Sequence, residues 1–164
     1  MENKAKQKEL VEALIRNEKA LEELYETYAE KLVLYREFWH KIAKDEESHA
    51  AWIGTLYAKM ENGLVDFSEN RFPIEAIQDF IRHTEEKKKE ALEGKTTLEE
   101  ALETAVHMER GLLENKFFEV FKDDSLEIKI ILEALRMGTE AHLKDVERVW
   151  KKEKGGAEYE RQAD

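Results

Sequence analysis

The stretch REFWHKIAKDEESHAAWIGTLYAKME, residues 36–61, decides the fold predicted for this chain. Its apolar residues recur every three or four positions, which is the spacing of an amphipathic helix. These residues are Trp39, Ile42, Ala43, Ala50, Ile53, Leu56 and Met60. A helix of this length buries its apolar face only against other helices, so the stretch predicts a helical bundle.

Three further stretches have the same apolar periodicity, at about residues 7–32, 97–121 and 126–152. A short turn at residues 33–35 separates the first helix from the second, and Asp123-Asp124-Ser125 separates the last two. Helices joined by turns this short pack as antiparallel pairs. The sequence therefore predicts two helical hairpins.

Between the hairpins lie residues 62–96, far more than two neighbouring helix ends need. Pro73 fits the start of a shorter helix that ends near residue 93. We interpret this segment as a long crossover that contains a short helix. The predicted fold is all-α: an antiparallel four-helix bundle in one domain over residues 1–153, followed by a flexible C-terminal tail at residues 154–164.

The composition agrees with helices and narrows the function. The chain has 164 residues with one Pro, no Cys and a net charge of −11. The absence of Cys excludes disulfide scaffolds, thiolate metal sites and cysteine nucleophiles. The negative charge argues against nucleic acid as a partner, because its phosphates would be repelled. The start MENKAKQKEL has no signal-peptide core, and no run approaches the roughly 18 apolar residues of a membrane span, so we expect a cytoplasmic protein with no membrane partner.

Polar residues interrupt the apolar faces of all four long helices near their midpoints. They are Glu18, Glu46, His49, Glu109, Thr139 and His142. Glu18 and Glu46 lie 14 residues before and after position 32, and Glu109 and Thr139 lie 15 residues before and after position 124. Because both positions fall in or beside a hairpin turn, these residues are predicted to meet at one level in the centre of the bundle.

The spacing Glu-x-x-His occurs twice in the second helix, nine residues apart. At about 100° per residue, the two pairs point to opposite sides of the helix. Glu37 and His40 share their face with lysines, which is typical of a solvated surface. Glu46 and His49 share theirs with Ile42 and other apolar residues. We therefore expect the first pair to be exposed and the second to be buried.

Three carboxylates and two imidazoles at one level suit iron, manganese or zinc. An ionised carboxylate buried alone costs several kcal/mol, so a central cluster of three needs compensating charge. The candidate ligands are Glu18, Glu46, His49, Glu109 and His142, with Thr139 as a weak ligand or a gap and Tyr25 as a hydrogen-bond donor to a ligand carboxylate. The alternative is a register in which some of these residues lie at the rim of the bundle and pair with Lys or Arg.

These motifs resemble the rubrerythrin branch of the ferritin-like superfamily of di-iron carboxylate proteins. The segment EKALEELY at residues 18–25 resembles the first helix of that family, with Tyr25 seven residues after the ligand Glu. The segment FWHKIAKDEESHA at residues 38–50 is similar to its second-helix signature and is the most specific match. Residues 101–118 resemble its third helix at Ala105, Glu109 and Phe117.

The resemblance implies a ferritin-like bundle with two metal positions at its centre. In that scheme Glu18, Glu46 and His49 hold one ion. Glu109 and His142 hold the second, with Glu46 bridging. The resemblance also implies an iron-dependent oxidoreductase acting on peroxide or O₂, supplied by an external electron donor and assembled as a homodimer or larger oligomer. One or two iron ions are expected, with manganese or zinc as alternatives, and no catalytic residue is assigned.

Two departures from that family concern the fourth helix and the third. The fourth reads Thr139-Glu140-Ala141-His142 where the family has Glu-x-x-His, so a bridging carboxylate is missing and the second metal position in particular is weakened. Glu140 points about 100° away and returns only through a π-bulge, which Gly138 would ease. Leu112 stands where the family carries a further Glu, and no Cys is present for its cysteine-ligated iron domain. These departures favour the alternative, a non-catalytic structural or interaction module that has lost the di-iron chemistry.

Overall fold

The computed structural model of the chain describes residues 2–62, 74–115 and 126–161. Every regular element in these residues is helical, which confirms the predicted all-α class. The elements are α1 (Glu2–Lys31), η1 (Val33–Tyr35), α2 (Arg36–Glu61), α3 (Ile74–Leu92), α4 (Leu98–Asn115) and α5 (Leu126–Arg161), with η1 a single 3-10 turn. In this part of the chain no helix is both long and apolar enough to cross a membrane.

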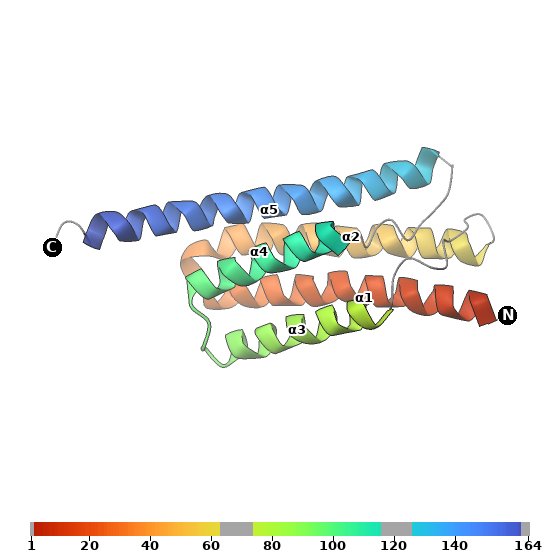
Figure 1. Ribbon diagram of the computed structural model, residues 1–164, viewed down its shortest axis with the longest axis horizontal. Helices are drawn as coiled ribbons and strands as arrows, with labels where there is room; N and C mark the ends of the chain where they lie inside the picture. Colours follow the sequence, from red (N-terminus) through yellow and green to blue (C-terminus); the bar gives the residue numbers. More distant parts are fainter. Residues whose placement is uncertain (1, 63–73, 116–125, 162–164) are drawn as a thin grey trace.

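The helices pack as two antiparallel pairs and one additional helix (Figure 1). α1 and α2 lie side by side and are joined by η1, as the short turn predicted. α4 packs against α5, which runs in the opposite direction and also contacts α2. α3 lies along α1 and falls within the predicted crossover, where a short helix was expected.

Helix ends differ from the prediction at both ends of the chain. α1 begins at Glu2 and not near residue 7, because its first residues are mostly helix-forming Lys, Glu, Ala and Gln, without a Gly or Pro. α5 continues to Arg161, beyond the helix end predicted near residue 152, so residues 154–161 of the predicted tail are helical.

The continuation of α5 has a local explanation. Gly155 lies inside the helix without the positive φ that commonly ends one. The ammonium of Lys154 lies 4.2 Å from the centre of the Trp150 ring, one turn back on the same helix. Outside the described residues lie the last three residues of the predicted tail, the predicted end of the third long helix at 116–121, the turn at Asp123-Asp124-Ser125 and the helix start at Pro73.

The connection from α3 to α4 is set by two local signals. Gly94 ends α3 with a φ of 71°, a conformation that other residues seldom adopt. Thr97 caps α4: the amide of Glu100 donates to Thr97 Oγ1 at 3.3 Å, and the amide of Thr97 donates to Glu100 Oε2 at 2.8 Å. This reciprocal pair fixes where α4 starts, and therefore the depth at which its later residues meet the other helices.

An aromatic cluster fills the core between the α1–α2 turn and the polar residues. The ring of Trp39 lies 5.7 Å from that of Tyr25 and 5.0 Å from that of Tyr28, and all three residues are fully buried. Such aromatic packing contributes large buried area at fixed geometry. It holds α1 against α2 directly beside the level at which the polar residues lie.

Candidate metal centre

All six polar residues predicted to interrupt the apolar faces are buried. Each is at most 4% exposed, and together they come from the middle parts of α1, α2, α4 and α5: Glu18, Glu46, His49, Glu109, Thr139 and His142. They are buried because they occupy core positions in the same 3.6-residue periodicity as their apolar neighbours. The alternative, in which some of them lie at the rim beside Lys or Arg, is wrong for these residues.

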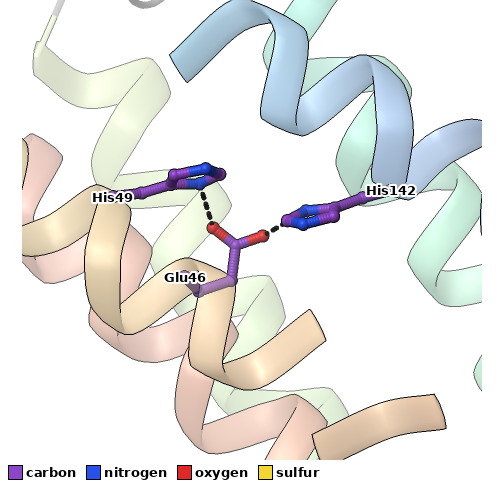
Figure 2. A group of neighbouring side chains, drawn as sticks. All are labelled: Glu46, His49 and His142. Carbon is purple, nitrogen blue, oxygen red and sulfur yellow. Dashed lines mark hydrogen bonds and ion pairs between the residues drawn. The ribbon is translucent and has the colours of Figure 1, made fainter. Parts of the chain in front are cut away.

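Glu46 lies between the two imidazoles and contacts both (Figure 2). Its Oε2 is 2.8 Å from His49 Nδ1 on the same helix, and its Oε1 is 3.0 Å from His142 Nδ1 on α5. The donor atoms of these three residues lie within 4.8 Å of one another, so they could hold a metal ion. The carboxylate of Glu46 thus offers one oxygen to His49 and the other to His142.

Glu18 and Glu109 complete the two halves from opposite sides. Glu18 Oε2 lies 3.6 Å from His49 Nδ1, and Glu109 Oε2 lies 3.7 Å from His142 Nδ1. Each imidazole Nδ1 therefore faces one oxygen of Glu46 and one oxygen of a second carboxylate. Each half of the cluster, with His49 or His142 at its centre, could thus offer a cation one imidazole nitrogen and two carboxylate oxygens.

Two of these oxygens have no hydrogen-bond partner among the described residues, although they are buried. They are Glu18 Oε2 and Glu109 Oε2, the atoms that face the imidazoles. The other oxygen of each residue is partnered: Asn17 Nδ2 donates to Glu18 Oε1 at 3.3 Å, and the Tyr25 hydroxyl donates to Glu109 Oε1 at 2.7 Å. Buried oxygens are seldom left unpartnered, so the free pair fits a cation as the missing partner.

Burial and mutual charge shift the pKa values of the cluster. Burial raises the pKa of Glu18 to about 8, and burial together with the charge of Glu46 raises that of Glu109. Burial opposes charge on His49 and His142 as well, but hydrogen bonds to the carboxylates outweigh it and raise their pKa values to about 10 and about 11. Although burial opposes its ionisation, the same bonds hold the pKa of Glu46 below its usual range.

These raised pKa values mean that His49 and His142 are both positively charged imidazolium groups near neutral pH when no metal is bound. The protons partly neutralise the buried carboxylates, which is the compensating charge that the cluster requires. A metal ion binds only deprotonated imidazole nitrogen, so it would displace these protons from Nδ1 and take over their electrostatic role.

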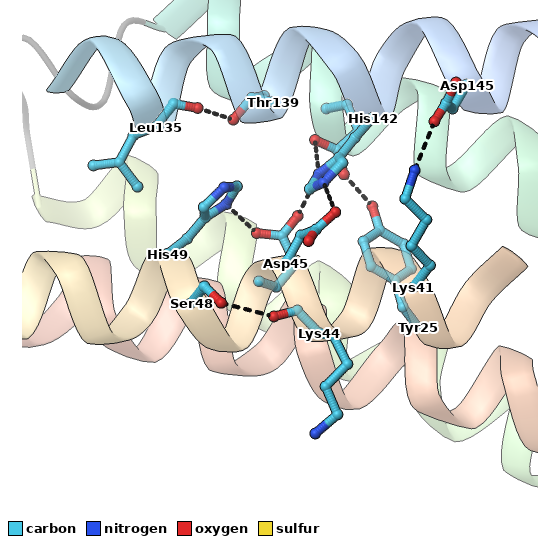
Figure 3. A network of polar contacts seen from close by, with 12 residues as sticks. Tyr25, Lys41, Lys44, Asp45, Ser48, His49, Leu135, Thr139, His142 and Asp145 are labelled. Atoms are coloured by element: carbon cyan, nitrogen blue, oxygen red, sulfur yellow. Dashed lines mark hydrogen bonds and ion pairs between the residues drawn. The ribbon is translucent and has the colours of Figure 1, made fainter. Parts of the chain in front are cut away.

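Asp45 is a member of the site that the sequence did not single out. Its Oδ2 lies 3.2 Å from His142 Nε2 (Figure 3), whereas Glu46 contacts the other ring nitrogen, Nδ1. The side chain is 49% exposed, so it lies off the apolar face of α2. The apolar periodicity of α2 does not mark Asp45. The periodicity of one helix cannot show which of its side chains reaches the neighbouring helix.

Thr139 occupies the core position expected, but its hydroxyl is already used. Thr139 Oγ1 donates to the backbone carbonyl of Leu135 at 3.1 Å (Figure 3). α5 stays α-helical through this region, so there is no π-bulge, and Glu140 pairs with Arg136 at the surface. The suggestion that Glu140 returns to the site is therefore wrong, and α5 contributes no carboxylate to the cluster among the described residues.

Gly138 provides the room for one of the ligands. A Cβ built on Gly138 would lie 2.5 Å from His49 Nε2 and 2.9 Å from His49 Cε1. A side chain here would therefore displace the imidazole. The role predicted for Gly138, easing a bulge in α5, is replaced by close packing of the helix backbone against His49.

Comparison of the chain with protein-family models, with curated proteins and with solved structures finds no match. The case for a metal centre accordingly rests on the residues of this chain and their geometry. The second Glu-x-x-His pair serves as an internal reference, since His40 is about half exposed and contacts Glu26 Oε1 at 2.8 Å on α1. It lies on the solvated face, as predicted.

Proposed function

We propose that this chain is a metal-binding protein of ferritin-like topology, similar to the rubrerythrins, whose polar layer holds one or two iron ions. The observation that carries the proposal is the convergence of three buried carboxylates and two buried imidazoles. The two oxygens that face the imidazoles have no hydrogen-bond partner in the part of the chain that the structure describes. Manganese and zinc prefer similar ligands and are the alternative metals. The long crossover between the helical pairs also suits a ferritin-like bundle.

The contacts divide the ligands into two sets that share one residue. Glu18, Glu46 and His49 form the first set, and Glu46, Glu109 and His142 form the second. Each set offers one imidazole nitrogen and two carboxylate groups. Such a set leaves coordination positions open for a small substrate, as metal sites with few protein ligands do.

We propose that the activity is oxidation–reduction of peroxide or O₂. Iron held here would supply the electrons for this chemistry by changing its oxidation state. The residues of the chain would hold and enclose the reacting group: Glu46 contacts both imidazoles, the Tyr25 hydroxyl donates to Glu109, and Trp39 packs beside Tyr25 in the buried core. We also propose an external electron donor and a homodimer or larger assembly, both on the family resemblance alone.

The second candidate function is a non-catalytic helical module. The observation that favours it is Thr139, whose hydroxyl is bonded to Leu135 and which supplies no carboxylate where the family has one. A cluster of this kind without metal would be held by the two imidazolium groups. The two candidates differ in metal content and in turnover.

Metal content after anaerobic loading with Fe(II) and desalting separates these candidates. The test variant is Glu46→Gln, which keeps the size of the side chain and removes the shared carboxylate. The matched control is Glu47→Gln, because Glu47 is the next residue on α2, is 56% exposed and pairs only with Lys44 among the described residues. We expect about two irons per chain in the wild type and in the control, and none in Glu46→Gln. One iron would indicate a half-filled centre, and no iron in the wild type would refute the proposal.

Turnover is then measured with the loaded protein. Reduced, iron-loaded protein is expected to consume hydrogen peroxide faster than the same concentration of free Fe(II), and the Glu46→Gln variant no faster than free Fe(II). If the loaded wild type matches free Fe(II), the protein binds metal without this activity, and the non-catalytic module becomes the better assignment.

A further inference from the structure

The two halves of the centre correspond residue by residue, yet their surroundings differ. Glu46 precedes His49 by three residues on α2, and Thr139 precedes His142 by three on α5. Each imidazole turns its Nδ1 towards the carboxylates and its Nε2 towards the opposite helix, at the residue directly before Glu46 or Thr139. On α2 that residue is an aspartate and on α5 it is a glycine, so the two rings have different partners behind them.

The ring of His142 is held from both sides. Its Nδ1 is 3.0 Å from Glu46 Oε1 and its Nε2 is 3.2 Å from Asp45 Oδ2. The carboxylate that completes this half, Glu109, is held in turn by the Tyr25 hydroxyl at 2.7 Å, a bond between two fully buried residues. Both side chains that would bind a cation here are therefore oriented by a hydrogen bond on the side away from it.

The ring of His49 has less support. Its Nε2 faces the backbone of Gly138, which offers no side-chain acceptor, and no hydrogen bond to this nitrogen is found within the described ranges 2–62, 74–115 and 126–161. The carboxylate that completes this half, Glu18, receives only a 3.3 Å bond from the amide of Asn17. A neutral donor at that distance orients a carboxylate less firmly than a phenol at 2.7 Å.

A hydrogen bond on the outer nitrogen of a ligand histidine matters for metal binding. The proton then resides on Nε2, the lone pair on Nδ1 is left free for the ion, and the ring cannot rotate away. Loss of such a partner commonly weakens metal binding by about 10–100-fold. The gap at Thr139 was expected to weaken the position of Glu109 and His142 in particular. The carboxylate missing there would have bridged both positions, however, so its loss does not by itself favour either of them.

We infer that the centre binds its two ions unequally: the position formed by Glu46, Glu109 and His142 fills first, with Asp45 as the residue that positions His142 for it. The position formed by Glu18, Glu46 and His49 fills second and exchanges its ion more readily. This inference rests on the proposed function, since it concerns the order of filling within the same centre.

The test is a titration of metal-free protein with Co²⁺ followed by calorimetry and visible absorption. We expect two steps in the wild type. Asp45→Asn is expected to weaken the first step by about 10–100-fold and to leave the second within about threefold. The matched control is Asp145→Asn on α5, because Asp145 is also a partly exposed aspartate but pairs with Lys41 and Arg148 and contacts no candidate ligand.

Two variants, His142→Gln and His49→Gln, test whether the position formed by Glu46, Glu109 and His142 is the one that fills first. The inference expects His142→Gln to lose the tight step and His49→Gln to keep it. The reverse result overturns the order of filling, and equal effects of Asp45→Asn and Asp145→Asn overturn the role of Asp45. Wild-type protein that takes up no Co²⁺ overturns the proposed metal centre itself, which is a different outcome from two steps in the wrong order.

A spectroscopic signature distinguishes positioning from a general structural effect. In the complex with one equivalent of Co²⁺, the Nε2 proton of the bound histidine gives a paramagnetically shifted NMR signal that disappears in D₂O. Asp45 shields this proton, so we expect the signal in the wild type, in Asp145→Asn and in His49→Gln, and its loss by rapid exchange in Asp45→Asn. A signal that persists in Asp45→Asn contradicts the inference, whether or not the melting temperature has changed.

Discussion

Two Glu-x-x-His pairs nine residues apart on α2 carry the same groups at the same spacing, and they have opposite surroundings. Glu37 and His40 are exposed, and His40 contacts the partly exposed Glu26 on α1. Glu46 and His49 are at most 2% exposed and face the carboxylate of Glu18. Half a turn of rotation around the helix separates a surface ion pair from a buried candidate ligand set.

The difference shows that the motif does not define the chemistry. An exposed pair contributes about 0–1 kcal/mol to stability because water solvates both charges. In the core each charge needs a partner, so the same two residues become dependent on Glu18, Glu109 and His142. The predictions that follow concern this difference between the exposed pair, Glu37 and His40, and the buried pair, Glu46 and His49.

The largest effect expected is on the pH dependence of stability without metal. The pKa values of His49 and His142 rise from 6.5 to about 10 and about 11 on folding. Because the folded state binds these protons more tightly than the unfolded state, the two histidines stabilise the fold fully below pH 6.5. This contribution to the free energy of unfolding is lost as the pH rises towards 10. Glu18, raised from 4.5 to about 8, adds a loss of the same sign, whereas the lowered pKa of Glu46 acts only below 4.5.

Urea denaturation of metal-free protein between pH 6.5 and 9 checks this expectation. The free energy of unfolding should fall throughout that range in the wild type and in His40→Ala, and fall less steeply in His142→Gln. Saturating metal should abolish or reverse the slope, because the displaced protons make binding tighter at higher pH. A metal-free protein with constant stability over this range would mean that the buried imidazoles are neutral.

The next effect concerns removal of one imidazole from each pair. His49→Ala leaves Glu46 and Glu18 buried with one partner fewer, which should lower the free energy of unfolding by about 3–5 kcal/mol at pH 7. His40→Ala removes a half-exposed contact and should change it by less than about 1 kcal/mol. Urea titrations of both variants give the comparison, and similar losses would erase the distinction between the two pairs.

Metal should stabilise the folded chain through the buried pair alone. At a free concentration of about one hundred times the Kd, binding adds about 2.7 kcal/mol, or roughly 5–10 °C in melting temperature for a domain of this size. We expect this rise with Fe(II), Mn(II) or Zn(II) in the wild type and in Glu37→Gln. Differential scanning calorimetry should show no rise in Glu46→Gln; a full rise there would place the bound metal elsewhere.

The smallest effect comes from the glycine that packs on the buried pair. Gly138→Ala places a Cβ against His49 Nε2 and should cost about 1–3 kcal/mol through strain, together with weaker metal binding. Gly155→Ala in the same helix meets nothing within 4 Å and should stabilise by up to about 1 kcal/mol, as alanine favours helices. If both substitutions stabilise, His49 is free to move and Gly138 does not define its position.

Most of the buried site followed from periodicity and counting along the chain. Glu18, Glu46, Glu109 and Thr139 were placed at one depth because each lies an equal distance from a turn, and the structure brings their helices together at that level. Asp45 could not be found in this way, since a half-exposed residue leaves no mark in an apolar pattern. Its role depends on how closely α5 approaches α2.

The helix termini were harder to predict for a different reason. The cap at Thr97 is a local signal, because its partner Glu100 is only three residues away. Glycine is typical of a helix end, but α5 continues past Gly155, and Lys154 contacts the ring of Trp150 one turn earlier in the same helix. A side-chain contact between residues one turn apart can outweigh the low helix propensity of a single glycine, and such a contact is hard to weigh from composition alone.

The sequence distances within the centre set an order in which it can form. Glu18, Glu46 and His49 all lie on α1 and α2, which are joined by the single turn η1. The contact from Glu46 to His142 spans 96 residues, and that from Tyr25 to Glu109 spans 84. On a ribosome adding about 5–20 residues per second, the first hairpin emerges seconds before α5. The nascent chain therefore carries three of the five candidate ligands on its first hairpin before the other two, Glu109 and His142, have both been synthesised.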